Sequence, residues 1–223
     1  MQTDIQLLQS VFLVPLTLLP IINPVGNVPI FTALSDGNPA IAGPMARQVA
    51  INACVILTVS MLVGSYVLDL FGISLAIVRV AGGLLVAATG WRMLQAPDED
   101  AVRHAVAGQA AALSSRELAR RSFFPMSFPL TTGPGSIATA IALGTTTPAT
   151  TATHVLTGGV VALCGSLLTA AAVYFSYRFG TLLLQRLGEI GTLVMTRFAA
   201  FILLCIGLQM VWTGWLGLPA AAL

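Results

Sequence analysis

Two short segments rich in proline and glycine interrupt apolar stretches that are otherwise long enough to cross a membrane. The first covers residues 23–29 (NPVGNVP) and the second covers residues 129–135 (PLTTGPG). Proline removes a backbone donor and clashes with the preceding turn, and glycine permits dihedral angles outside the helix. A bilayer tolerates the freed backbone groups only where protein or a wet cavity satisfies them. The two segments therefore predict two broken helices, which are typical of transporter binding sites.

The side chains at these breaks could bind a small polar solute. Asn23 and Asn27 bracket the first break and offer amide groups beside freed carbonyls. A new helix is expected to begin near Ser136, and its N-terminal amides would favour a carboxylate or another anionic group. We therefore predict a site for a small zwitterion, while two simple kinks that serve helix packing remain the alternative. The predicted substrate-binding residues are Asn23, Pro24, Gly26, Asn27, Thr131, Thr132, Gly133, Gly135 and Ser136.

The elements that position these residues are membrane helices. Of the 223 residues, 57% are hydrophobic and 8% are charged, and the mean hydropathy of +0.91 lies outside the usual range of soluble domains. The apolar runs have about the 20 residues that a helix needs to cross the hydrocarbon layer, and the two-residue alternation of a β-barrel is missing. We predict an all-α membrane protein with six transmembrane helices, at residues 7–34, 49–70, 73–95, 120–143, 153–178 and 193–216.

The two halves of the chain resemble each other. Each half opens with a broken span, continues with an unbroken span and closes with a span that bears an arginine near its start. A unit of three spans must enter the membrane in the opposite sense to its copy, so we predict a 3+3 inverted repeat. The predicted units are residues 1–95 and 123–223, joined by a cytoplasmic linker at residues 96–122. Rocking of one repeat against the other would expose a midplane site to each side in turn.

Arg79 and Arg197, the arginines of the closing spans, carry a positive charge whose burial in the membrane must be compensated. An arginine at the middle of a membrane helix costs about 2.5–3.5 kcal/mol, which snorkelling to the headgroups reduces. The alternative is a buried acidic partner, and the acids nearest in sequence are Asp69 for Arg79 and Glu189 for Arg197. An inverted repeat places the two arginines near opposite membrane faces. We therefore predict that these four residues form gates or structural clamps.

The other polar residues within the spans give no catalytic pattern. Asn52 and Gln209 are predicted to hydrogen-bond between helices. Cys54, Cys164 and Cys205 have no spacing that suggests a metal site, and we expect small, buried, inert thiols. There is no phosphate-binding glycine loop followed by Lys-Ser/Thr, and no His-Glu-x-x-His. The sequence therefore predicts no enzyme, no metal and no cofactor.

The basic residues indicate an orientation. All ten are arginines, and the formal net charge of +2 gives no reason to expect nucleic acid binding. By the positive-inside rule, the arginine-bearing loops are cytoplasmic, so both termini are predicted to be periplasmic. The arginines of or beside these loops are Arg47, Arg92, Arg103, Arg116, Arg120, Arg121, Arg178 and Arg186.

Three motifs carry a resemblance to a known family. They are residues 22–31 (INPVGNVPIF), residues 71–74 (FGIS) leading to residues 79–83 (RVAGG), and residues 129–137 (PLTTGPGSI). The chain resembles the MarC family of bacterial inner-membrane proteins over nearly its whole length. Ala199-Ala200 departs from the glycine that is usual after the arginine of the sixth span. The resemblance implies a multi-pass inner-membrane protein, grouped with neutral amino acid transporters.

Together, the motifs and the resemblance favour a transporter or exporter of a small solute such as a neutral amino acid. The predicted mechanism is alternating access at the midplane site between the broken helices. The coupling ion, sodium or a proton, is undetermined, and buried acids for a proton relay are scarce. The expected partners are membrane lipid and the solute, and a homodimer remains open. The alternative is a membrane scaffold that modulates a partner protein without transport.

Overall fold

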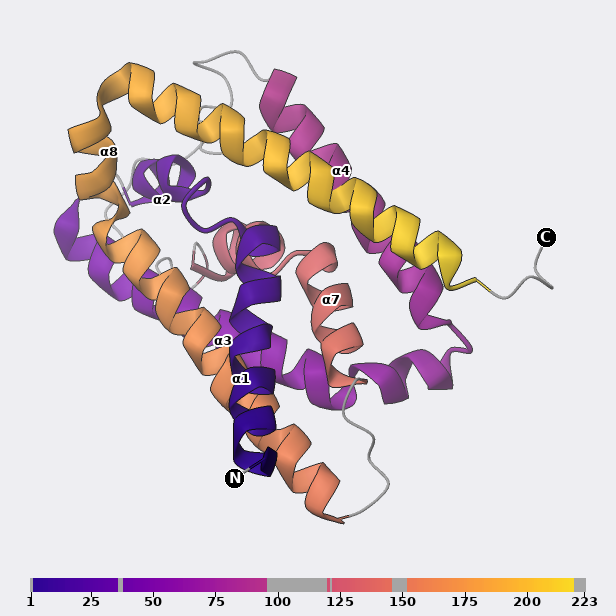
Figure 1. The fold of residues 1–223 in the computed structure, drawn as a ribbon. Coiled ribbons are helices and arrows are strands. Elements are labelled where there is room, and N and C mark those ends of the chain that lie inside the picture. Colours follow the sequence, from indigo (N-terminus) through magenta and orange to yellow (C-terminus); the bar gives the residue numbers. More distant parts are fainter. Residues whose placement is uncertain (1, 36–37, 96–119, 121, 146–151, 219–223) are drawn as a thin grey trace.

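The computed structural model describes residues 2–35, 38–95, 120, 122–145 and 152–218 (Figure 1). These residues contain helices and no strand. The elements are α1 (Gln2–Ile22), α2 (Val28–Leu34), α3 (Pro39–Leu70), α4 (Leu75–Gln95), the irregular helix η1 (Ser122–Thr131), α7 (Pro134–Gly144) and α8 (Ala152–Leu216).

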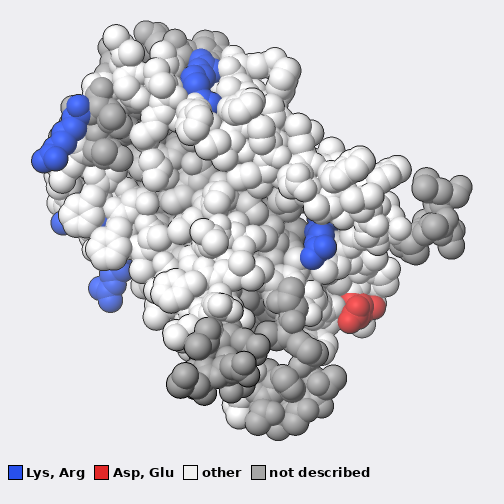
Figure 2. Space-filling view, in the orientation of Figure 1, with Lys and Arg blue, Asp and Glu red and all other residues white. Residues whose placement is uncertain are grey.

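Four helical segments are long and apolar enough to cross a membrane, and two shorter apolar helices accompany them. The long segments are Pro39–Leu70, Leu75–Gln95, Leu156–Gly180 and Leu193–Leu216, and the shorter ones are Leu7–Ile22 and Pro134–Gly144. Large apolar side chains remain exposed along these helices, and Figure 2 shows a largely uncharged surface with scattered arginines and an acidic group near its edge. The predicted class of all-α membrane protein is confirmed. The six-span 3+3 inverted repeat and its division at residues 96–122 remain predictions.

Helices end where the two motifs place a break. At the first break α1 ends at Ile22, Asn23 has a φ of 47°, and α2 begins only at Val28. At the second break Gly133 is extended, with a ψ of 173°, and Pro134 starts α7. Proline suits the first position of a helix because its missing N–H has no intrahelical partner there. The helix expected near Ser136 therefore begins two residues earlier.

Helical structure extends beyond two of the predicted span boundaries. The span predicted to begin at residue 49 belongs to α3, which begins at Pro39 with Asn38 as its N-cap and has 32 residues. At 1.5 Å per residue α3 is roughly 48 Å long, which exceeds the ~30 Å of hydrocarbon. The interval between the predicted spans 153–178 and 193–216 is also helical, with a kink inside α8 at Gly188, where φ is 68° and ψ is −176°. A positive φ favours glycine at that kink.

The buried core combines both halves of the chain. It contains residues of α1, α2 and α3 together with Met126, Ala140 and the part of α8 from Val161 to Tyr177. Among the described residues, this core includes none from α4 and none from residues 193–216. Those two segments pack against each other, and Figure 1 shows α4 beside the yellow C-terminal part of α8. We call α4 and residues 193–216 the helix pair.

Glycines allow the helix pair to pack at close range. A Cβ at Gly83 would lie 2.7 Å from the Gly207 carbonyl oxygen, and a Cβ at Gly90 would lie 2.6 Å from the Leu204 nitrogen. Such backbone approach is typical of membrane helix pairs with small residues at the contact. Ala200 is fully buried, and its carbonyl oxygen also faces Gly90.

The thiols lie less deep than expected. Cys54 is half-buried, whereas Cys164 and Cys205 are exposed on the outer surface of α8. The prediction of buried thiols is therefore wrong for the latter two, because no described segment covers the helix faces that carry them.

Candidate functional site

The two breaks lie against each other and share a buried amide. Asn27 is 6% exposed. Its Nδ2 donates to the Ile22 carbonyl at 3.1 Å and to the Leu130 carbonyl at 3.2 Å. One side chain thus satisfies a carbonyl of each interrupted segment, where the helical partner is missing. We call this contact region of residues 22–31 and 127–136 the junction.

A tyrosine from α8 braces the junction. The Tyr177 hydroxyl lies 2.9 Å from the Thr131 hydroxyl, and the two share a hydrogen bond. The Tyr177 ring stacks on Phe31 of α2, with a centroid distance of 4.8 Å and an interplanar angle of 5°. Sequence reasoning missed Tyr177. The only signal was a polar hydroxyl in an apolar span, which needs a partner when it is buried.

The second break is held by a compact set of hydrogen bonds around Ser127. The Ser127 carbonyl accepts from both the backbone N–H and the hydroxyl of Thr132, each at 2.7 Å. The Ser127 hydroxyl donates to the Ser122 carbonyl at 2.6 Å and accepts from Asn52 Nδ2 of α3 at 3.0 Å. The predicted interhelical role of Asn52 is confirmed.

Most of the predicted substrate-binding residues are buried at the junction. Pro24, Gly26, Asn27, Thr131, Thr132, Gly135 and Ser136 are buried, while Asn23 and Gly133 are half-buried. Asn23 Oδ1 accepts from the Gly26 N–H at 3.2 Å, and the Ser136 hydroxyl donates to the Gly133 carbonyl at 2.9 Å. The side-chain hydrogen bonds described for Asn23 and Thr132 stay within their own segments, whereas Asn27 joins the two segments. The binding role of these nine residues remains a prediction.

One buried polar atom at the first break lacks a hydrogen-bond partner among the described residues. Asn23 Nδ2 is buried and has no hydrogen-bond partner among the described residues. A buried donor without an acceptor costs about 1–3 kcal/mol. This unsatisfied donor is the kind of group that a bound solute or an ordered water would satisfy.

Arg197 clamps the end of α4. Its Nη1 donates to the Met93 carbonyl at 3.0 Å and also to the Leu94 carbonyl. The last carbonyls of a helix have no intrahelical partner and carry partial negative charge, so a guanidinium stabilises them. The described contacts support the structural-clamp prediction. The predicted partner Glu189 has a side chain outside the described part of the chain.

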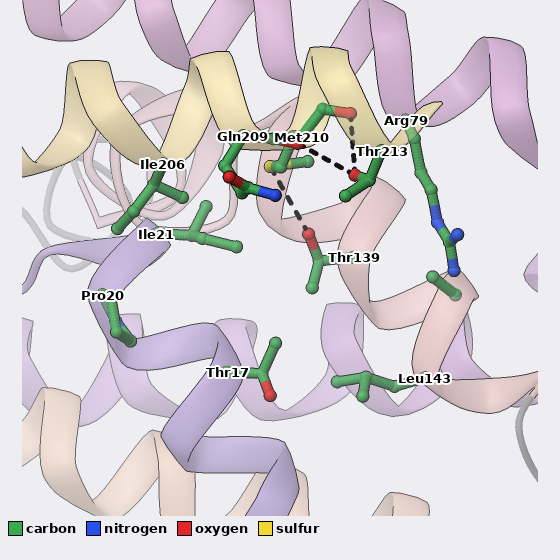
Figure 3. Close-up of a pocket in the computed structure, with 11 residues that line it drawn as sticks. Thr17, Pro20, Ile21, Arg79, Thr139, Leu143, Ile206, Gln209, Met210 and Thr213 are labelled. Atoms are coloured by element: carbon green, nitrogen blue, oxygen red, sulfur yellow. Dashed lines mark hydrogen bonds between the residues drawn. The ribbon is translucent and has the colours of Figure 1, made fainter. Parts of the chain in front are cut away.

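Arg79 faces a cavity instead of an acid. Asp69 is exposed, and no hydrogen bond or ion pair within the described residues joins it to Arg79. Arg79 lines a cavity of about 410 Å³ between α1, α7 and the helix pair. Figure 3 shows the Arg79 side chain running from α4 towards α7. The cavity is lined by Thr17, Pro20, Ile21, Arg79, Thr139, Ala142, Leu143, Ile206, Gln209, Met210 and Thr213.

Each wall of this cavity is one face of a helix. Residues 17, 20 and 21 of α1 have the spacing i, i+3, i+4, as do residues 139, 142 and 143 of α7. Gln209 was predicted to hydrogen-bond between helices, but its side chain is exposed and makes no such bond within the described residues. In Figure 3 the Gln209 amide lies between Ile21 and Thr139. Residues 20 and 21 also adjoin the first break, so the cavity and the junction are neighbours.

The described residues contain no group of three or more His, Cys, Asp or Glu side chains that could hold a metal ion. The polar side chains at the junction and in the cavity are amides, hydroxyls and the guanidinium of Arg79. Such groups can bind and orient a polar solute by hydrogen bonding.

Comparisons with known proteins agree with the membrane architecture. The model of the MarC family integral membrane proteins matches residues 8–218. The inner membrane proteins MarC of Escherichia coli (strain K12) and of Shigella flexneri are each 31% identical over 214 residues, covering 94% of this chain and 96% of the relative. No solved structure matches the chain.

Proposed function

Because the chain belongs to the MarC family of integral membrane proteins, and because its two broken helices meet in one buried junction, we propose that it carries a small solute across the inner membrane. Transport proceeds by alternating access at a midplane site between the broken helices. The chain is a multi-pass membrane protein like its relatives. The predicted periplasmic position of both termini is part of the proposal.

The observation that carries the proposal is the shared amide of Asn27. Two unrelated packing kinks have no need of a hydrogen-bonding side chain that they share. Here one buried side chain bridges the carbonyls of two separate breaks. Membrane transporters place substrate sites between discontinuous helices of this kind. The interpretation as two unrelated kinks accounts less well for this bridge.

The junction supplies groups that suit a small zwitterion. Gly133 caps α7 without a side-chain hydrogen bond, so the amides that follow it remain for an anionic group. Asn23 Nδ2 offers a further donor, and the freed carbonyls offer acceptors for an ammonium group. In this conformation Asn27 occupies two of these carbonyls, so we propose that the structure represents a closed state. Neutral amino acids are accordingly the first solutes to test.

The moving boundary that we propose separates the buried core from the helix pair. The core draws on both predicted halves, so two rocking three-helix repeats would have to divide it. The helix pair, in contrast, connects to the core through Gly72 and Gly188, whose φ values are 66° and 68°. A Cβ at either glycine would meet nothing within 4 Å. These two glycine turns are the positions at which we propose that the helix pair pivots.

Uptake into proteoliposomes tests the proposed function. Purified protein should show saturable counterflow of at least one neutral amino acid or related zwitterion, measured with and without sodium and proton gradients. Asn23→Ala and Thr132→Val should reduce the flux at least about tenfold, the factor that corresponds to roughly 1.4 kcal/mol for one lost polar contact. Asn23→Gly separates the loss of the amide from backbone strain, because glycine adopts the positive φ of this position.

Protein folding is checked in the same preparations. Variants that keep the monodisperse elution and yield of the unmodified chain but lose flux support the solute site. Loss of folded protein in all three variants means that the breaks are structural. Absence of flux for every solute, from folded and inserted protein, favours the scaffold alternative, whose arginine-rich linker lies mostly outside the described residues.

A further inference from the structure

The cavity beside the junction contains a guanidinium that no group of the described residues neutralises. Arg79 is half-buried, and the described residues give it no hydrogen bond and no ion pair. The lining of the cavity includes no Asp or Glu. A charged side chain at membrane depth normally pairs with another charge or with backbone carbonyls, as Arg197 does at the end of α4. The corresponding arginine of the first half therefore lacks the partner that its counterpart has.

The rest of the cavity is suited to the body of a small solute. Pro20, Ile21, Leu143, Ile206 and Met210 give it an apolar lining. Its volume of about 410 Å³ lies within the range of small-molecule sites.

The few polar groups are placed around this lining. The hydroxyls of Thr17 and Thr139 donate to carbonyls of their own helices, at 2.8 and 2.9 Å, so they face the cavity as acceptors. The Gln209 amide adds a donor and an acceptor on the wall formed by α8. A positive charge at one end and sparse polar groups on an apolar wall complement a carboxylate on a short apolar body.

We propose that this cavity binds a small monocarboxylate, with the carboxylate on Arg79 and the apolar body against Ile21, Ile206 and Met210. The planar guanidinium matches the two oxygens of a carboxylate and forms paired, charge-assisted hydrogen bonds. Short-chain carboxylic acids and neutral amino acids share this chemistry. None of the nine residues predicted at the junction lines the cavity. The site therefore goes beyond the proposed function, and its occupancy can be measured without transport.

Titration calorimetry on the purified protein in neutral detergent tests the site. The probes are sodium butyrate and L-valine, each compared with its uncharged or cationic amide, butyramide and L-valinamide. At least one carboxylate should bind, and the corresponding amide should bind at least about tenfold more weakly, because it cannot form the charge-assisted pair. If butyrate binds, a carboxylate on a short apolar chain is sufficient for binding. If L-valine binds and butyrate does not, the site also requires the amino group.

Substitutions of the lining assign the binding to this cavity. Arg79→Gln should weaken carboxylate binding about tenfold or more and should leave the thermal unfolding midpoint of the ligand-free protein unchanged or higher, since it removes an uncompensated charge. Arg79→Lys should retain part of the affinity. Ile206→Trp should weaken binding by filling the cavity without changing its charge. Arg47→Gln, at an exposed arginine of α3, is the matched control and should bind like the unmodified chain.

Three results would overturn the proposal. The first is equal affinity of the carboxylates and their amides, and the second is unchanged binding in both Arg79→Gln and Ile206→Trp. The third is binding of phosphatidylglycerol, added as a separate titrant, with no binding of butyrate or L-valine. That third outcome would identify a site for an anionic lipid headgroup.

Discussion

A Gly207→Val variant is expected to yield almost no folded protein. A Cβ at Gly207 would lie 2.7 Å from both the Ala87 Cα and the Gly83 carbonyl oxygen. These are backbone atoms, so a side-chain rotation cannot relieve the contact, and α4 must separate from residues 193–216. Overpacking of a close contact costs about 3 kcal/mol when neighbours cannot yield, a large part of the stability of a typical domain. The monodisperse peak in size-exclusion chromatography of detergent extracts measures the loss.

Gly159→Val is the matched control for this substitution. Gly159 also lies inside α8, but a Cβ there would meet nothing within 4 Å. This variant adds the same isopropyl side chain and the same change of helix propensity, so its yield should remain near that of the unmodified chain. Equal losses in both variants would assign the effect to helix propensity. Retention of folded protein by Gly207→Val would contradict the close packing of the helix pair.

An Asn27→Leu variant is expected to lose both stability and transport. Leucine preserves the approximate size of the side chain but cannot donate to the Ile22 and Leu130 carbonyls. Each buried group left without a partner costs about 1–3 kcal/mol. The thermal midpoint in detergent should fall markedly, and saturable flux should disappear because the two breaks no longer share a bond.

Thr32→Val is the control for Asn27→Leu. The Thr32 hydroxyl donates at 2.9 Å to the Val28 carbonyl within α2, so its removal affects only a local bond. Its thermal midpoint and flux should stay close to those of the unmodified chain. A midpoint for Asn27→Leu as high as that of the control would mean that water already satisfies the two carbonyls. The bridge across the junction would then have no structural importance.

The breaks could be predicted from sequence because proline and glycine act locally. Closely spaced proline and glycine residues at 24, 26 and 29, and at 129, 133 and 134, disfavour a continuous helix through each segment. The kink at Gly188 was not predicted, although it also depends on a glycine. A single glycine inside an apolar run gives a weak signal, since membrane helices tolerate many of them. The early start of α3 was missed because residues 39–48 lie beyond the apolar run.

The contacts of the site depended on information that no sequence motif carries. The sequence offered Glu189 as a nearby acid for Arg197, as an alternative to snorkelling, but it gave no sign of the described acceptors, the Met93 and Leu94 carbonyls. Every residue has a backbone carbonyl, so an acceptor of this kind leaves no signature in the sequence. Tyr177 and the faces that line the cavity were missed for a related reason. Which helix faces meet is decided by tertiary packing, and here the packing combines the two halves in one core.

The most direct test of the central claim is a reversible lock across the proposed moving boundary. A Cβ at Gly82 of α4 would lie 2.9 Å from the Ala138 Cβ of α7, slightly closer than the roughly 3.5–4.5 Å that a disulfide spans. Cysteines are placed at positions 82 and 138 in a chain whose Cys54, Cys164 and Cys205 are replaced by alanine. Counterflow is then measured in proteoliposomes after oxidation and after reduction.

Transport by alternating access predicts saturable flux in the reduced protein, loss of that flux on oxidation and recovery on renewed reduction. Electrophoretic mobility confirms that the disulfide has formed. Undiminished flux with the disulfide fully formed would contradict the proposed boundary. Absence of flux in both states, from protein that is folded and inserted and for every solute tested, would contradict the transporter assignment itself.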